Sequence, residues 1–138
     1  MVSARLDSED AVTVTPQGDE THLHVLDGHV FEELLATLGN DTQRMRSVYR
    51  KFVDSAANRL DEVRHQPVTG SAATFHALKG SAGMVGANRI AAVAARLQDA
   101  APGLNEEARA AAIGELEAEL ETFRRALGVQ LESLPPGR

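Results

Sequence analysis

His76 is the residue best placed for chemistry in this sequence, because its expected helical neighbours leave room around the imidazole. An imidazole is a nitrogen nucleophile, but a large partner reaches it only where no bulky side chains intervene. The residues three or four positions away, with one more a further turn along, are Ala72, Ala73, Lys79, Gly80 and Gly83. All except Lys79 are small, so the pattern predicts an open approach to His76.

The glycines and the lysine of this stretch are more useful for function than for packing. Gly80 and Gly83 each cost a helix interior about 1 kcal/mol relative to alanine, so a purely structural helix gains little from both on an exposed face. Lys79 puts a cation one turn from His76, where it can pair with phosphoryl oxygens. Singly, each feature has an ordinary explanation, because isolated surface histidines are common and spaced glycines often mark close helix contact. Together they indicate a functional surface.

Composition and periodicity predict that helices position this surface. Aromatic residues make up 4% of the chain and tryptophan is absent, so the apolar content favours helix over sheet. Apolar residues recur at spacings of three and four in five segments. These are a short helix from Asp27 to Gly39, a long one from Asp41 to before Gln66, a third from Thr69–Ser71 to Gly86, a fourth over 87–100, and a fifth from Asn105 through Leu127.

The four longer segments predict an all-α fold, an antiparallel four-helix bundle with a short extra N-terminal helix. In the third helix, Phe75, Leu78, Ala82 and Val85 mark the buried side, and His76, nearly opposite Leu78, should face solvent. The charged residues of the last helix should form its solvent-exposed face: Glu115, Glu117, Glu119 and Arg124.

One domain fits the length of 138 residues. We expect a flexible acidic arm or interdomain linker over residues 1–25, the bundle over 26–133, and a disordered tail over 134–138. The net charge of -6 disfavours nucleic acid and anionic membranes as partners, and the absence of cysteine excludes disulfides and thiolate metal sites. No signal peptide or membrane span is evident, so we expect a cytoplasmic protein without membrane insertion.

The residues from His76 to Ala82 (HALKGSA), followed by Val85-Gly86-Ala87 and Ile90, resemble the signature of the histidine-phosphotransfer (HPt) family of two-component phosphorelays. The resemblance covers residues 26–131 and implies a four-helix bundle with an exposed histidine midway along it. It further implies that His76 is phosphorylated on a ring nitrogen, with Lys79 and Gly80 as companions and Gln98 of the next helix reaching the imidazole. The surface on which a partner docks would then comprise Ala72, Ala73, Gly80 and Gly83.

Such a domain is expected to be a phosphorelay intermediate and not an enzyme. It would accept a phosphoryl group from one receiver-domain aspartate and pass it to another. The expected partners are response-regulator receiver domains and a sensor histidine kinase. Mg²⁺ is expected in the partner receiver, and no cofactor or metal in this chain. We expect a monomer, either free-standing or the C-terminal cytoplasmic module of a membrane-bound hybrid sensor histidine kinase.

Other functions are weighed against this one. A non-catalytic helical docking module that binds a receiver or another regulator would have the same helices. A hydrolase with His76 as general base lacks a predictably paired carboxylate or hydroxyl. The glycine-rich stretch from Gly80 to Gly86 lacks the Gly-Lys-Ser/Thr ending of a nucleotide-binding loop. His22 and His24 have no evident third metal ligand.

Overall fold

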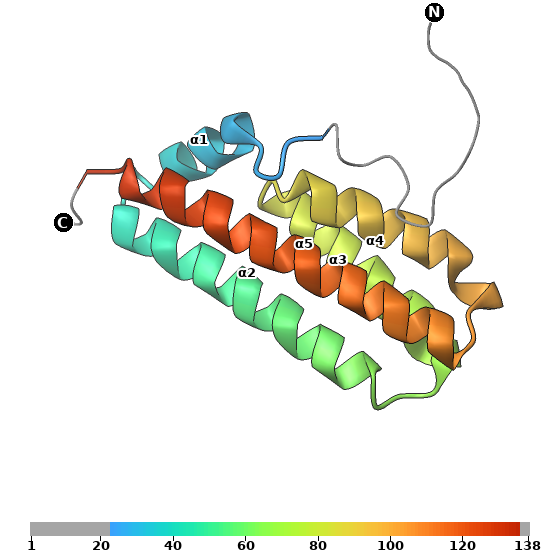
Figure 1. Cartoon of the computed structure of the whole chain (residues 1–138). Helices are drawn as coiled ribbons and strands as arrows, with labels where there is room; N and C mark the ends of the chain where they lie inside the picture. The colour runs from blue at the N-terminus through green and yellow to red at the C-terminus, as the bar shows by residue number, and fades with distance from the viewer. Residues whose placement is uncertain (1–22, 136–138) are drawn as a thin grey trace, which may run out of the picture.

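The computed structural model describes residues 23–135, which form five α-helices and two 3-10 helices and contain no strand. Figure 1 shows the four long helices side by side, and the predicted all-α bundle with an extra N-terminal helix is confirmed. Most of the predicted arm (1–22) and the end of the predicted tail (136–138) lie outside the described residues. The elements are α1 (Gly28–Thr37), α2 (Thr42–Val63), η2 (Val68–Gly70), α3 (Ser71–Met84), α4 (Asn88–Ala100), η3 (Ala101–Gly103) and α5 (Glu106–Glu132).

Three helices begin directly after the polar residues at which the sequence predicts their starts. The side chains of Asp27, Asp41 and Asn105 each accept a hydrogen bond from a backbone N–H in the first turn, at 2.9, 3.1 and 2.8 Å. The first N–H groups of a helix have no intrahelical acceptor, so each cap satisfies a donor that would otherwise depend on water. The caps therefore fix where α1, α2 and α5 start.

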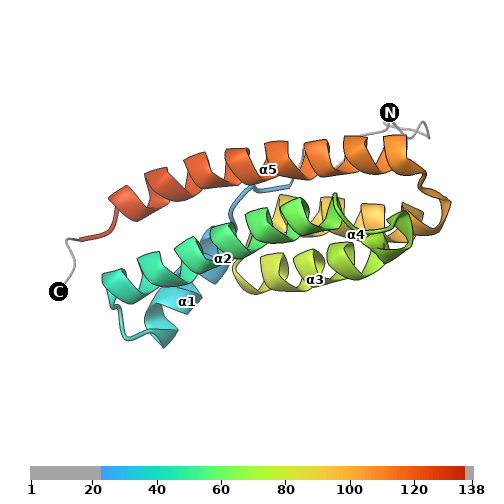
Figure 2. The ribbon, with the colours of Figure 1, turned by 90° about the horizontal axis from the view of Figure 1, so that it is seen from below.

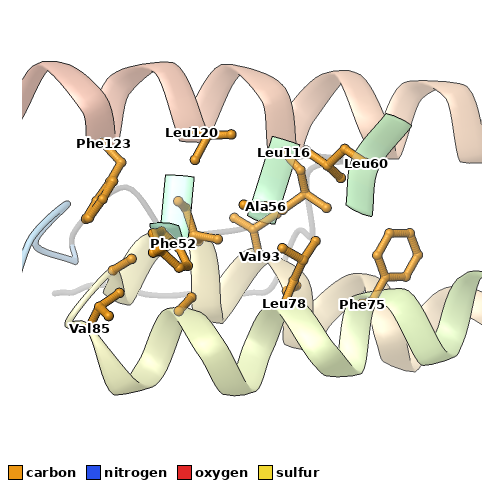
Figure 3. Packing of buried hydrophobic residues seen from close by; sticks show 14 of the residues in the cluster. Phe52, Ala56, Leu60, Phe75, Leu78, Val85, Val93, Leu116, Leu120 and Phe123 are labelled. Atoms are coloured by element: carbon orange, nitrogen blue, oxygen red, sulfur yellow. The ribbon is translucent and has the colours of Figure 1, made fainter. Parts of the chain in front are cut away.

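The core runs along the axis of the bundle and determines how α3 is rotated. Figure 3 shows Phe75 and Leu78 of α3, and Val85 just after its end, pointing into the space below α5 in which Phe52 of α2 and Leu116 of α5 also lie. All five side chains are at most 9% exposed. Complete burial of such a side chain stabilises the fold by about 1.5–3 kcal/mol. This packing fixes the inner side of α3 and turns the residues opposite it outward.

The hairpin of α3 and α4 covers only part of the bundle. These helices have 14 and 13 residues, against 27 in α5. Figure 2 shows α1 beyond the end of this hairpin, against the first half of α2. There the ring of Phe31 stacks on that of Tyr49, with centroids 5.7 Å apart. The short first helix therefore closes the part of the core that α3 and α4 leave uncovered.

Two ion pairs between α4 and α5 correct the prediction that Glu115 and Glu119 belong to a solvated face. Arg96 binds Glu115, and Arg89 Nη2 lies 3.0 Å from Glu119 Oε2. The four side chains are only 15–23% exposed, so their charges attract more strongly than surface charges do. The pairs hold α4 at a defined place against α5. The other two predicted members of that face are exposed: Glu117 and Arg124.

Arg109 of α5 is buried, with 6% of its surface exposed. Its Nη1 donates hydrogen bonds to the carbonyl oxygens of Val63, at 2.9 Å, and Gln66, and its Nη2 donates to that of Arg64 at 3.4 Å. These carbonyls end α2 and begin the following turn, where helix carbonyls lack intrahelical donors and the helix dipole is negative. Arg109 of α5 therefore holds the segment between α2 and α3 against α5.

Candidate functional site

His76 lies in the middle of α3 and is exposed, as the helical spacing predicts. The inner side of the same helix carries Phe75, Leu78 and Ala82, each at most 1% exposed. These side chains are locked in the core, so the backbone that carries His76 is rigid. A reactive group on a helix packed in this way is held more accurately than one on a loop.

One hydrogen bond from α4 orients the imidazole. Gln98 Nε2 lies 3.2 Å from His76 Nδ1. The Oε1 atom of the same amide is buried and has no hydrogen-bond partner. The second ring nitrogen, His76 Nε2, has no hydrogen-bond partner among residues 23–135. Gln98 therefore contacts one nitrogen of the ring, and the other nitrogen stays available to a partner from outside the described fold.

Small residues surround His76 and leave space above α3. A Cβ atom added to Gly80 or Gly83 would have no other atom within 4 Å, so packing requires neither glycine. Ala73 is exposed and Ala72 is partly buried. The structure therefore brings these four residues of the predicted surface together around His76 without covering it.

Lys79 is exposed one turn along α3 from His76. It forms no ion pair with another described residue. An ammonium group without a carboxylate partner can bind an incoming anion through charge-assisted hydrogen bonds. The position is therefore suited to an anionic group carried on the imidazole.

The surroundings of His76 do not resemble those of a catalytic base. Among residues 23–135, no carboxylate or hydroxyl side chain is hydrogen-bonded to His76. A hydrolytic histidine is normally oriented by such a group and paired with a nucleophile. The same residues contain no group of three or more His, Cys, Asp or Glu side chains that could hold a metal ion. His22 lies outside them, and His24 is exposed.

The turn between α3 and α4 sets the register of the two helices that carry the site. The hydroxyl of Tyr49 donates to the carbonyl of Val85 at 2.8 Å, and the backbone N–H of Asp27 donates to that of Gly86 at 2.8 Å. Asn88 Nδ2 donates to Asp27 Oδ2 at 3.2 Å. Burial raises the pKa of Tyr49 to about 12, and the hydrogen bond from Asn88 lowers the pKa of Asp27. The turn is thus held by hydrogen bonds from Asp27, which caps α1, and from Tyr49 of α2.

Met84, the last residue of α3, is a feature of this face to which the sequence pattern assigns no role. It is 79% exposed, and it follows Gly80 at helical spacing. The spacing was visible in the sequence, but a methionine at that position could equally belong to the core. Only the packed structure shows that the Met84 side chain points away from the core.

Comparison with known proteins agrees with this geometry. The sequence matches the family model of the Hpt domain over residues 29–126, and the chain belongs to the Hpt domain family. An Hpt domain is a phosphotransfer carrier of two-component signalling that interacts with response-regulator receivers and kinases. No curated protein and no solved structure matches the sequence. Within residues 23–135, no helix has the length and apolar character needed to cross a membrane.

Proposed function

We propose that His76 is the phosphorylated residue of this Hpt domain, accepting a phosphoryl group from one receiver aspartate and passing it to another. The observation that carries the proposal is the exposed imidazole itself. One ring nitrogen lies 3.2 Å from Gln98 Nε2, and the other has no hydrogen-bond partner among the described residues. It projects from a face on which Gly80 and Gly83 leave open space.

The transfer step needs only a nucleophile from this chain. The lone pair of His76 Nε2 attacks the phosphorus of the aspartyl phosphate, so an N–P bond forms. The O–P bond to the aspartate breaks, and the carboxylate leaves with the bonding electrons. The proton on Nδ1 stays on the ring, so no proton has to be removed. Transfer to a second receiver reverses these steps, with Mg²⁺ of the receiver stabilising the phosphoryl oxygens.

Gln98 is proposed as the positioning residue that selects which tautomer of His76 is present. With its Nε2 toward the ring, the amide donates to Nδ1, and the ring proton then sits on His76 Nε2 and blocks that nitrogen. After half a turn of the amide, Gln98 Oε1 accepts from Nδ1–H, and the lone pair of His76 Nε2 is free to react. This turn would also give the buried Oε1 the hydrogen-bond partner that it lacks.

Lys79 is proposed to bind the phosphoryl group once it is on the ring. A phosphoryl group is strongly anionic near neutral pH and forms charge-assisted hydrogen bonds with cations. Lys79 is exposed one turn from His76 and has no ion-pair partner among the described residues. The receiver is proposed to dock on Ala72, Ala73, Gly80 and Gly83.

The cellular setting is proposed from the family and the charge. Donor and acceptor are proposed to be response-regulator receivers, with a sensor histidine kinase upstream. The net charge of -6 suits a protein partner better than nucleic acid or an anionic membrane, and the proposed location is the cytoplasm. We propose a monomeric bundle over 26–133, preceded by a linker and followed by a short tail. It would act alone or as the C-terminal module of a hybrid sensor kinase.

Phosphotransfer from receivers tests this function. Receiver domains of the source organism are phosphorylated with acetyl phosphate and Mg²⁺ and mixed with the protein at short times. An acid-labile, base-stable phosphate is expected on the wild type and on His29→Gln, whose exposed histidine on α1 makes it the matched control. His76→Gln should accept none while keeping its helix content.

The opposite result would favour the non-catalytic docking module. In that case a receiver would bind tightly without transferring phosphate, and His76→Gln would leave the affinity unchanged. Transfer to both histidine variants would place the phosphate on another residue.

A further inference from the structure

Every fourth residue along the outer side of α3 lies in one row, formed by Ala72, His76, Gly80 and Met84. Residues four positions apart are neighbours on a helix surface, each about 6 Å further along the axis. Gly80 is midway between His76 and Met84, and a Cβ there would have no atom within 4 Å. A partner surface can therefore pass from His76 to Met84 without meeting a side chain.

Met84 supplies an apolar contact at one end of this row. In residues 23–135 only two large hydrophobic side chains are strongly exposed, Met84 at 79% and Val129 at 72%. Single exposed hydrophobic residues are common and need no function. Val129 on α5 fits that explanation, whereas Met84 lies about 12 Å along α3 from the proposed reactive histidine. The thioether side chain is flexible and adapts to the surface of a partner.

A small pocket lies at the other end of the row, beside Ala72. Its volume is about 230 Å³. Ala72 precedes His76 by one turn of α3, so one wall of the pocket lies one helical turn from the residue that carries the imidazole. A pocket of this size and largely apolar lining suits a single apolar side chain of a protein partner better than a drug-sized ligand. It is lined by Val68, Thr69, Ala72, Ala101, Pro102 and Leu104.

We propose that Met84 and the pocket beside Ala72 are the two apolar anchors of the receiver-docking surface, one on each side of His76. The inference rests on the proposed function and deepens it by describing the partner. Ala72, which lines the pocket, and Met84 are about 18 Å apart along α3, which fits within one interface of standard size. The receiver should therefore carry one apolar contact on each side of its aspartate, with the contact toward Met84 farther from the aspartate than the contact toward the pocket.

Met84→Gln tests the first anchor, because glutamine has a similar length and helix propensity but is polar. The receiver that transfers most rapidly to the wild type is the probe, and KM and kcat for transfer are measured. We expect Met84→Gln to raise KM about tenfold with kcat unchanged, as for loss of an interface anchor. Met84→Leu should restore KM to within about twofold. Val129→Gln, the matched control, should behave like the wild type.

Equal KM values for Met84→Gln and Val129→Gln would overturn the assignment of Met84. This outcome differs from failure of the proposed function, in which the wild type itself would accept no phosphate. Thermal unfolding of each variant checks that the bundle is intact.

Thr69→Phe tests the second anchor, because Thr69 is exposed at the rim of the pocket and a phenyl ring there would fill it. We expect KM for the same receiver to rise several-fold. Thr37→Phe, at an exposed threonine that ends α1, is the control and should leave KM unchanged. An unchanged KM in Thr69→Phe would remove the pocket from the docking surface.

Discussion

The glycines on the outer side of α3 and the glycine in the turn after it are in opposite structural situations. Gly86 has a φ of +79°, and a Cβ there would lie 3.0 Å from Cβ of Val30. Gly80 and Gly83 are helical, and a Cβ on either would meet nothing. The backbone and the packing therefore require glycine in the turn. On the outer side of α3 nothing within the described fold requires it, which points to a partner.

The polar groups of the two regions differ in the same way. At the turn, the carbonyls of Val85 and Gly86 accept hydrogen bonds from Tyr49 and Asp27. At the outer site, one nitrogen of the His76 ring and the buried Gln98 Oε1 both lack a hydrogen-bond partner within residues 23–135. At the turn, the protein itself supplies the hydrogen-bond donors that these carbonyls need. The other region contains a ring nitrogen without a hydrogen-bond partner among the described residues, and such a nitrogen is able to bind a transferred group.

The largest effect is expected for Gly80→Leu. Leucine is the better helix former by about 1 kcal/mol, so the free energy of unfolding should stay the same or rise. The side chain would keep the receiver away from His76, and a displacement of about 1 Å can lower a transfer rate roughly 100-fold. Stopped-flow transfer and urea unfolding measure the two effects.

The matched control for this change is Gly114→Leu on α5, where a Cβ also meets nothing. It should leave transfer unchanged. Equal transfer rates for the two variants would show that the outer side of α3 does not form the interface.

The next largest effect is expected for Gly86→Ala, and it should be on stability. A left-handed backbone costs a residue with a Cβ about 1–2 kcal/mol, and contact with Val30 adds to that. We expect a loss of about 2–3 kcal/mol in the free energy of unfolding. Transfer by the folded fraction should be close to that of the wild type. A stability equal to that of the wild type would contradict the contrast between the two kinds of glycine.

Tyr49→Phe should destabilise the turn by about 1–2 kcal/mol, because the buried carbonyl of Val85 loses its donor. The effect depends on pH. Burial raises the pKa of Tyr49 to about 12, whereas an unfolded tyrosine ionises near pH 10. The contribution of the neutral phenol is complete below about pH 10 and is lost as pH rises toward 12. The stability difference between wild type and Tyr49→Phe should therefore shrink over that range, and a constant difference would contradict the assigned burial.

The smallest effect is expected for Gly83→Ala, and it has the opposite sign. Alanine should raise the free energy of unfolding by about 0.5–1 kcal/mol, since its methyl group fits and its helix propensity is higher. Gly114→Ala should give the same gain. Transfer should slow only in Gly83→Ala, because only that methyl group lies on the proposed docking surface. A loss of stability in Gly83→Ala would show that the space is not open.

Much of the fold could be predicted from the sequence, because the helices depend on local patterns. Spacings of three and four gave the five helices, and short polar residues at Asp27, Asp41 and Asn105 gave three of their starts. The exposure of His76 followed from the position of Leu78 on the same helix. Each of these depends on residues within a few turns of one another, so a single sequence contains the necessary information.

The contacts between distant helices could not be predicted in the same way. Arg109 lies in a run of alanines and resembles a surface residue, yet it binds carbonyls at the end of α2 and in the turn after it, more than forty positions earlier. Glu119 is paired with Arg89 because of how α4 lies against α5. The position of Gln98 against His76 was expected only from the family resemblance. Such contacts depend on how the helices pack against one another, and local periodicity does not predict that packing.

Locating the phosphate on the ring is the sharpest test of the role proposed for His76. The protein is labelled with ¹⁵N in its histidines, phosphorylated by a phosphorylated receiver, and studied by ¹⁵N and ³¹P NMR. Because the Gln98 amide is hydrogen-bonded to Nδ1 of the ring, we expect a single phosphohistidine, His76, with phosphorus on Nε2. Phosphorus on Nδ1 of His76, or on any other residue, would contradict it.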